Sequence, residues 1–183
     1  MEQMRATAPA FVDTLSRNTV VAGPKQQFHD VFTRELLVTR RVLLAMPEEH
    51  CEFRPHPRAR TARELAWSFS LVQASTAAAL TDQWAWPPRF PAAPESYDAV
   101  LTSFDATAQA VLHALANTPE ARLFATIPFM AGPKQPADVR VLDVLWFMLM
   151  DAVHHRGQFS IYLRMVGAKV PSIYGPSSDE PWS

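Results

Sequence analysis

The chain has 183 residues, of which 48% are hydrophobic and 19% are charged, and its formal net charge is −1. This composition is typical of one globular domain with a sizeable core and excludes a disordered chain. No stretch concentrates Lys and Arg, which argues against nucleic acid as a partner because binding it requires clustered positive charge. No apolar run approaches the ~18 residues that a membrane span needs. We therefore expect neither nucleic acid nor a membrane as a partner.

The cellular compartment and the domain limits are the next expectations. The single cysteine, Cys51, cannot form an internal disulfide, which favours a reducing compartment. The first residues carry Glu2 and Asp13 and no long apolar stretch, so they do not resemble a signal peptide. We expect a cytoplasmic protein. Residues 1–23 show no sustained period and are expected to form an N-terminal extension, followed by one domain over residues 24–183.

The first two predicted helices have clear start signals. Apolar residues recur at helical spacing from Pro24, a residue suited to a first helical turn, and Pro47 ends the pattern. A proline-rich loop follows. The second helix is predicted from Thr61 to about Thr81, because Thr61 and Glu64 have the spacing of a capping box.

Two further helices are predicted after a second proline-rich stretch. Ser96 is the expected N-cap of a helix over 96–117, and another helix is expected over about 139–166, before Gly167. Residues 118–138 are harder to assign, although TIPFM in this stretch has the character of a short extended segment. The C-terminal tail is expected to be extended and to pack on the domain through Ile173, Tyr174 and Trp182.

Four amphipathic helices of about 20 residues predict an all-α four-helix bundle roughly 30 Å long. The linker over residues 82–95 could stretch about 46 Å, which is longer than one helix. The helices at 61–81 and 96–117 can therefore run parallel to each other instead of forming a simple hairpin.

The segment MLMDAVHHRGQ in the last helix contains the candidate site residues. Asp151 and His155 are four residues apart, so they share a helical face and could converge on one cation. A buried Asp–His contact needs no metal, however, and a metal needs a third ligand from elsewhere. His154 points about 100° away round the helix and is more easily placed at the helix edge, bonded to a loop carbonyl. Arg156 is expected to tie down the tail by hydrogen bonds.

Three motifs resemble the DinB-like family of four-helix metalloenzymes. They are MPEEHCEFRP at 46–55, RTARELAW at 60–67 and HHRGQFSIYLRMVGAKVPSIYGPSSDEPW at 154–182. The resemblance covers roughly residues 24–182 in the same order. It implies an up-down-down-up bundle and a divalent metal, typically zinc or nickel, held by three histidines.

The positions of the family's ligands correspond to Ser68, Asp151 and His155 in this chain, and only His155 is a histidine. Asp151 and His155 are therefore the candidate metal ligands, and Ser68 and His154 the candidate cofactor-binding residues. A neutral hydroxyl competes poorly with water for zinc. Ser68 could instead bond Asp151, orient a metal-bound water, or serve as a nucleophile with His155 as base.

Two functions follow from the resemblance. One is a metal-dependent hydrolase or thiol-dependent transferase working with a degenerate metal site. The other is a non-catalytic ligand-binding or stress-response bundle that has lost its metal, its cavity retained for a small molecule. Trp67, Trp84, Trp86 and Trp146 would suit an apolar ligand if they gathered round a pocket. A homodimer through exposed helix faces is compatible with both functions.

Overall fold

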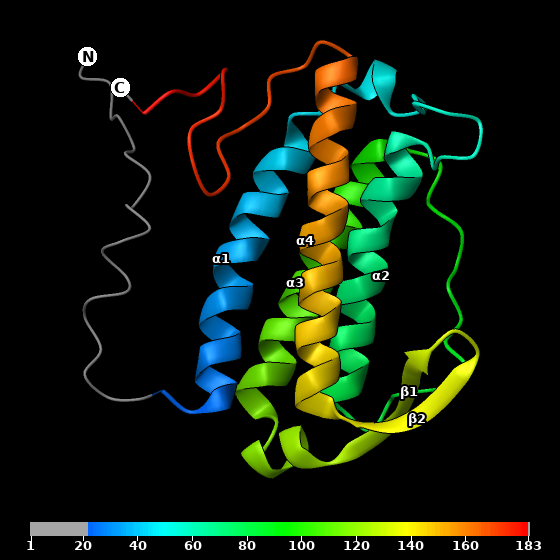
Figure 1. The fold of residues 1–183 in the computed structure, drawn as a ribbon, viewed down its shortest axis with the longest axis vertical. Coiled ribbons are helices and arrows are strands. Elements are labelled where there is room, and N and C mark those ends of the chain that lie inside the picture. Colours follow the sequence, from blue (N-terminus) through cyan, green and yellow to red (C-terminus); the bar gives the residue numbers. More distant parts are fainter. Residues whose placement is uncertain (1–21, 183) are drawn as a thin grey trace.

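The computed structural model describes residues 22–182, so all but the last two residues of the predicted extension at 1–23 lie outside it. Four helices dominate the described part (Figure 1): α1 (Pro24–Leu44), α2 (Ala62–Leu80), α3 (Tyr97–Asn117) and α4 (Val141–Met165). The shorter elements are η1 (Glu48–His50), η2 (Glu120–Phe124), β1 (Thr126–Gly132) and β2 (Gln135–Arg140). The domain is mostly helical, and none of the described helices is long and apolar enough to cross a membrane.

The directions of the helices agree with what the long linker allowed. In Figure 1, α1 rises, α2 and α3 both descend, and α4 rises again. The linker between α2 and α3 climbs along the outer side of α2 to the end where α2 began, so these two helices run parallel. The expected up-down-down-up order is confirmed.

The expectation of a purely all-α chain is wrong over residues 126–140. β1 and β2 form an antiparallel hairpin, paired from Thr126 with Arg140 to Gly132 with Gln135, with a bulge near Met130. In β1, burial alternates between neighbouring residues, and Ile127 and Phe129 are buried. This period of two places one face of β1 on the helices and the other in solvent.

Local capping explains where the helices begin. Pro24 occupies the first turn of α1. The capping box of α2 is present, because the Thr61 side chain accepts from the Glu64 N–H at 3.1 Å and the Glu64 carboxylate accepts from the Thr61 N–H at 2.8 Å. Ser96 caps α3 by accepting from the Ala99 N–H. These predicted start signals are confirmed.

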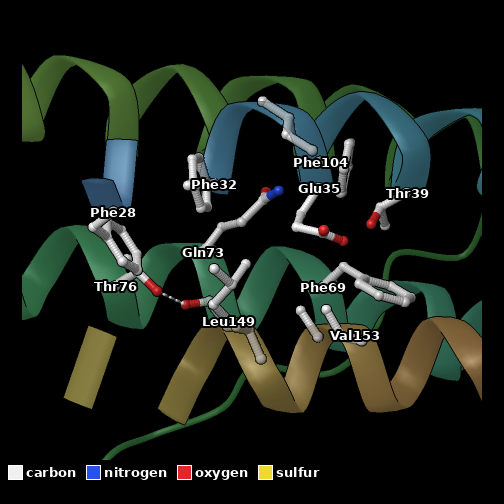
Figure 2. A pocket seen from close by; sticks show the side chains of 13 residues that line it. Phe28, Phe32, Glu35, Thr39, Phe69, Gln73, Thr76, Phe104, Leu149 and Val153 are labelled. Carbon is white, nitrogen blue, oxygen red and sulfur yellow. Dashed lines mark hydrogen bonds between the residues drawn. The ribbon is translucent and has the colours of Figure 1, made fainter. Parts of the chain in front are cut away.

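The helices enclose two apolar clusters, with polar side chains between them. One cluster packs α1, α3 and α4 against the hairpin, and the other lies toward the opposite end. A small interior cavity of about 20 Å³, the size of one water molecule, lies among the helices. Figure 2 shows the Glu35 carboxylate and the Gln73 amide beside it among phenylalanine rings. The Gln73 Oε1 atom accepts from the Thr107 hydroxyl at 2.5 Å, so this layer of the core is partly polar.

The tail after α4 is tied to the domain by charged groups. Arg164 pairs with Asp179 at 2.6 Å, and Arg41 of α1 pairs with Glu180 at 2.7 Å. Ile173 packs against the second apolar cluster, as expected. Trp182 does not pack as expected, because it is 67% exposed.

Candidate functional site

A cavity of about 710 Å³ lies beside α2 and α4. Its walls are the first half of α2, the middle of α4, the hairpin strand β1 and the linker between α2 and α3. A volume of this size is typical of small-molecule sites. It is separate from the small interior cavity of Figure 2, which lies between the helices.

Aromatic side chains form much of the cavity wall. Trp84 and Trp86 of the linker stack on each other with ring centroids 6.5 Å apart, and Phe129 of β1 packs against both at 6.0 and 6.1 Å. Phe147 of α4 meets Phe129 edge to face at 5.2 Å. The Trp84 indole N–H donates to the Pro128 carbonyl at 2.9 Å, which joins the linker to the hairpin. The wall is therefore built by segments that are far apart in the sequence.

Three of the four tryptophans considered from the sequence line this cavity, namely Trp67, Trp84 and Trp86. The Trp67 indole N–H donates to the Pro91 carbonyl at 2.9 Å and so holds the linker along α2. Trp146 does not line the cavity; it packs against Phe28 in the core.

The structure brings Ser68, Asp151 and His155 to the same cavity, although they come from two helices. Asp151 and His155 lie one turn apart on α4, and their Oδ2 and Nε2 atoms are 3.4 Å apart. Ser68 is buried on the facing side of α2. Ser68 comes from the first half of α2 and the other two from the middle of α4, whereas Trp84 and Trp86 of the linker pack against Phe129 of the hairpin.

His154, the other candidate cofactor-binding residue, does not line the cavity. It is exposed on α4, and its Nε2 atom lies 3.0 Å from the Gln158 amide nitrogen. His154 therefore lies at the helix edge, as predicted from the sequence. Its neighbour is Gln158 on the same helix, however, and not the predicted loop carbonyl.

The surroundings of His155 favour the neutral form of its imidazole. Burial lowers the pKa of its imidazole, and the nearby Arg60 charge lowers it further, while Asp151 opposes this change. Its Nδ1 atom is buried and has no hydrogen-bond partner among residues 22–182. Phe69 packs edge to face on the ring at 6.3 Å. A neutral imidazole has one nitrogen that can accept a proton.

Arg60 lines the cavity and was not singled out from the sequence. It lies just before the N-cap Thr61, and its Nη1 atom donates to the Ser68 hydroxyl at 2.6 Å. The same hydroxyl donates to the Glu64 carbonyl one turn back at 3.2 Å. A guanidinium thus occupies the space beside Ser68, for which the family resemblance predicted the position of a metal ligand. No local pattern predicts this contact, because Arg60 precedes α2 and its side chain reaches Ser68 by turning back over the first turns of the helix.

The residues present do not fit a tightly held divalent metal. Ser68 already bonds a cation, and a guanidinium beside the site repels a second one. Asp151 and His155 remain as ligands, whereas zinc sites normally have at least three from the protein. Across residues 22–182, no three His, Cys, Asp or Glu side chains are grouped so that they could hold a metal ion.

Comparisons with known proteins identify the fold and the family. A crystal structure of a DinB-like protein from Bacillus cereus has a TM-score of 0.65 and 20% identity, covering 81% of this chain and 97% of that one. The mycothiol-dependent maleylpyruvate isomerase, solved as a mutant, has a TM-score of 0.63 and 12% identity, covering 83% of this chain and 66% of that one. At these identities the likeness concerns the fold alone.

One sequence relative is closer over a short stretch. The uncharacterized protein YrdA of Bacillus subtilis is 42% identical over 38 residues, which is 21% of this chain and 23% of that protein. The family model described as "DinB family" matches residues 18–182, nearly the whole chain. The chain belongs to the DinB family.

Proposed function

We propose that this protein binds a small organic molecule in the cavity beside α2 and α4, and that it does so without a tightly held metal. The observation that supports this most directly is the cavity itself, about 710 Å³ in volume, with aromatic walls and a few polar side chains near one end. Sites for small molecules combine these features, because apolar walls supply affinity and a few polar groups fix orientation.

Exposed aromatic surface at the cavity supports the same proposal. Phe90 and Phe147 line it and are 60% and 55% exposed, and Met130 of the hairpin is 54% exposed. Covering apolar surface contributes roughly 25 cal/mol per Å². A ligand that enters the cavity would therefore gain free energy from surface that the fold leaves in contact with water.

A pair of neighbouring substitutions on α2 tests the proposal. Ser75 lines the cavity, and the neighbouring residue Ala74 is exposed and does not line it. We expect cinnamamide, a flat neutral probe, to bind the wild type and Ala74→Trp in ligand-observed NMR, and Ser75→Trp to abolish binding by filling the cavity. Equal binding to both variants, or no binding to the wild type at millimolar probe, would contradict the proposal.

A second candidate is a thiol-dependent transferase, and the pair of Asp151 and His155 favours it. A neutral imidazole beside a carboxylate can accept a proton from a thiol, which makes the thiol a better nucleophile. The structural neighbour that uses mycothiol makes a thiol a reasonable co-substrate to try. A metal-dependent hydrolase has less support, because the donor set lacks a third ligand.

This candidate is tested with mycothiol or glutathione and a chlorodinitrobenzene. In that reaction a carbon–sulfur bond forms, chloride leaves, and the thiol proton goes to His155. We expect His155→Gln to remove any protein-dependent rate, and the neighbouring His154→Gln to keep it, because His154 is exposed outside the cavity. A wild-type rate no higher than the uncatalysed rate would reject the transferase for these substrates.

A further inference from the structure

We infer that the cavity takes small organic anions, with a carboxylate held by Arg60, whose guanidinium Ser68 orients, and an apolar body among the aromatic side chains. This inference rests on the proposed small-molecule binding and names its ligand class. In place of the metal implied by the family resemblance, this chain presents a guanidinium, which is a permanent positive charge with a fixed fork of N–H donors.

Arg60 is available to a ligand, whereas the other arginine of the cavity is not. Arg63 is engaged by the Glu52 carboxylate at 2.5 Å and the Pro94 carbonyl at 2.7 Å. Within residues 22–182, the guanidinium of Arg60 has a hydrogen bond to Ser68 and no ion pair with a carboxylate. Ser68 is neutral and takes one N–H group, so the other donors of Arg60 are free to bind an anion.

The backbone that carries Arg60 is held in place. The Tyr162 hydroxyl of α4 donates to the Arg60 carbonyl at 3.0 Å, and Thr61, the next residue, is 1% exposed as the N-cap of α2. Ser68, which orients the guanidinium, is 6% exposed. A planar guanidinium on a fixed backbone suits a carboxylate, because two parallel N–H···O bonds can form at once.

Within residues 22–182, the acidic side chains of the cavity form no ion pair with Arg60, so its positive charge remains available to a ligand. The Glu64 carboxylate accepts from the Thr61 N–H and lies 3.9 Å from Arg54. Asp151 lies beside His155 and forms no ion pair with Arg60 within the part of the chain that the structure describes. Both carboxylates would meet a bound anion as like charges, and Asp151 is the one with which no arginine pairs within residues 22–182. Replacing it by asparagine should therefore strengthen anion binding.

Two probes of nearly equal shape separate the charge from the apolar body. Cinnamate carries a carboxylate, and cinnamamide replaces it with a neutral amide. In isothermal titration calorimetry we expect the wild type to bind cinnamate at least about 10-fold more tightly, because hydrogen bonds to charged groups are worth about 10-fold to 150-fold in affinity. Arg60→Gln should remove this preference and leave cinnamamide affinity within about twofold, since the amide does not need the charge.

The same titrations include a control variant that removes a positive charge outside the cavity. Arg58→Gln removes an exposed positive charge two residues away that does not line the cavity, and it should keep the preference for cinnamate. Asp151→Asn should increase cinnamate affinity. Equal affinity of the wild type for both probes, or a preference that survives Arg60→Gln, overturns the anion inference while the small-molecule proposal stands. Binding of neither probe overturns both.

Discussion

The buried ion pair between Arg156 and Glu35 provides a prediction whose size can be worked out from the structure. Arg156 is 1% exposed, and its Nη2 atom lies 2.6 Å from the Glu35 carboxylate. Its other bonds go to the Thr39 hydroxyl at 3.1 Å, the Glu35 carbonyl at 3.3 Å and the Tyr174 hydroxyl at 2.5 Å. One guanidinium therefore joins α4 to α1 and to the tail. Its other hydrogen-bond partners are neutral, so the Glu35 carboxylate balances its positive charge.

Glu35→Gln keeps the shape of the side chain and removes the charge. Breaking a buried pair from one side costs about 3–5 kcal/mol. We expect the lower end, about 3 kcal/mol, because the Glu35 side chain is 14% exposed and water reaches it. For a domain of this length, that lowers the Tm by about 6–12 °C. Urea unfolding followed by circular dichroism measures the free energy directly.

A surface pair supplies the matched control. Arg40 bonds Asp105 at 2.7 and 2.9 Å, but both side chains are 45% exposed. Asp105→Asn should cost less than about 1 kcal/mol, because solvent screens such pairs. If Glu35→Gln costs no more than Asp105→Asn, the reasoning from burial is refuted. Replacing both members of the buried pair, as Glu35→Leu with Arg156→Met, should be less harmful than Glu35→Gln, since it leaves no unpaired charge.

Three further predictions concern the site and its supports. The folded-state pKa of His155 is lowered by burial, so its contribution to stability is complete above the unfolded value of 6.5 and is lost as the pH falls below it. His155→Gln should therefore flatten the curve of stability against pH just below 6.5, and a wild-type curve that is already flat there would show the shift to be absent. Thr61→Ala removes the side-chain half of the capping box with Glu64 and should cost about 1 kcal/mol in urea unfolding; no loss would mean that the cap does not stabilise α2. Trp84→Phe deletes the bond to the Pro128 carbonyl and should speed amide hydrogen exchange in the hairpin but not in α3; unchanged hairpin exchange would refute the role given to this bond.

The helices could be predicted from the sequence because their signals are local. Pro24, the Thr61 capping box and Ser96 each act within one turn of the chain, so the starts of α1, α2 and α3 agree with expectation to within a residue. The hairpin could not be predicted as such. In β2 no residue is buried, and Gln135–Arg140 contains a proline and charged residues without alternation, so only its partner strand identifies it.

The candidate site, too, could be predicted only in part: the placement of three residues was expected, but the contact of Arg60 was not. Helical spacing and the family resemblance were enough to expect Ser68, Asp151 and His155 near one another, and all three line one cavity. The roles expected for them as metal ligands and cofactor-binding residues stay predictions. The contact of Arg60 with Ser68 depends on how one long side chain turns back over the first turns of α2, and periodicity has no information about that.

The role of Arg156 could be predicted only in part from the sequence. Its hydrogen bond to Tyr174 confirms that it ties down the tail. The sequence had no signal for its near-complete burial against Glu35, because these residues are 121 positions apart and meet only when α1 packs against α4. Long-range pairing of this kind is set by tertiary packing, which local pattern does not encode.

Zinc affinity is the measurement that tests most directly whether Arg60 and Ser68 have taken the place of a metal site. Untagged protein purified without chelator is titrated with zinc against a chromophoric chelator. It is compared with the variant Ser68→His/Asp151→His/Arg60→Gln, which supplies the three histidines that the family resemblance implies and removes the competing charge. We predict that the wild type holds no stoichiometric zinc and that the triple variant binds it at least about 100-fold more tightly. Stoichiometric zinc in the wild type, or equal affinity in the two proteins, would contradict this.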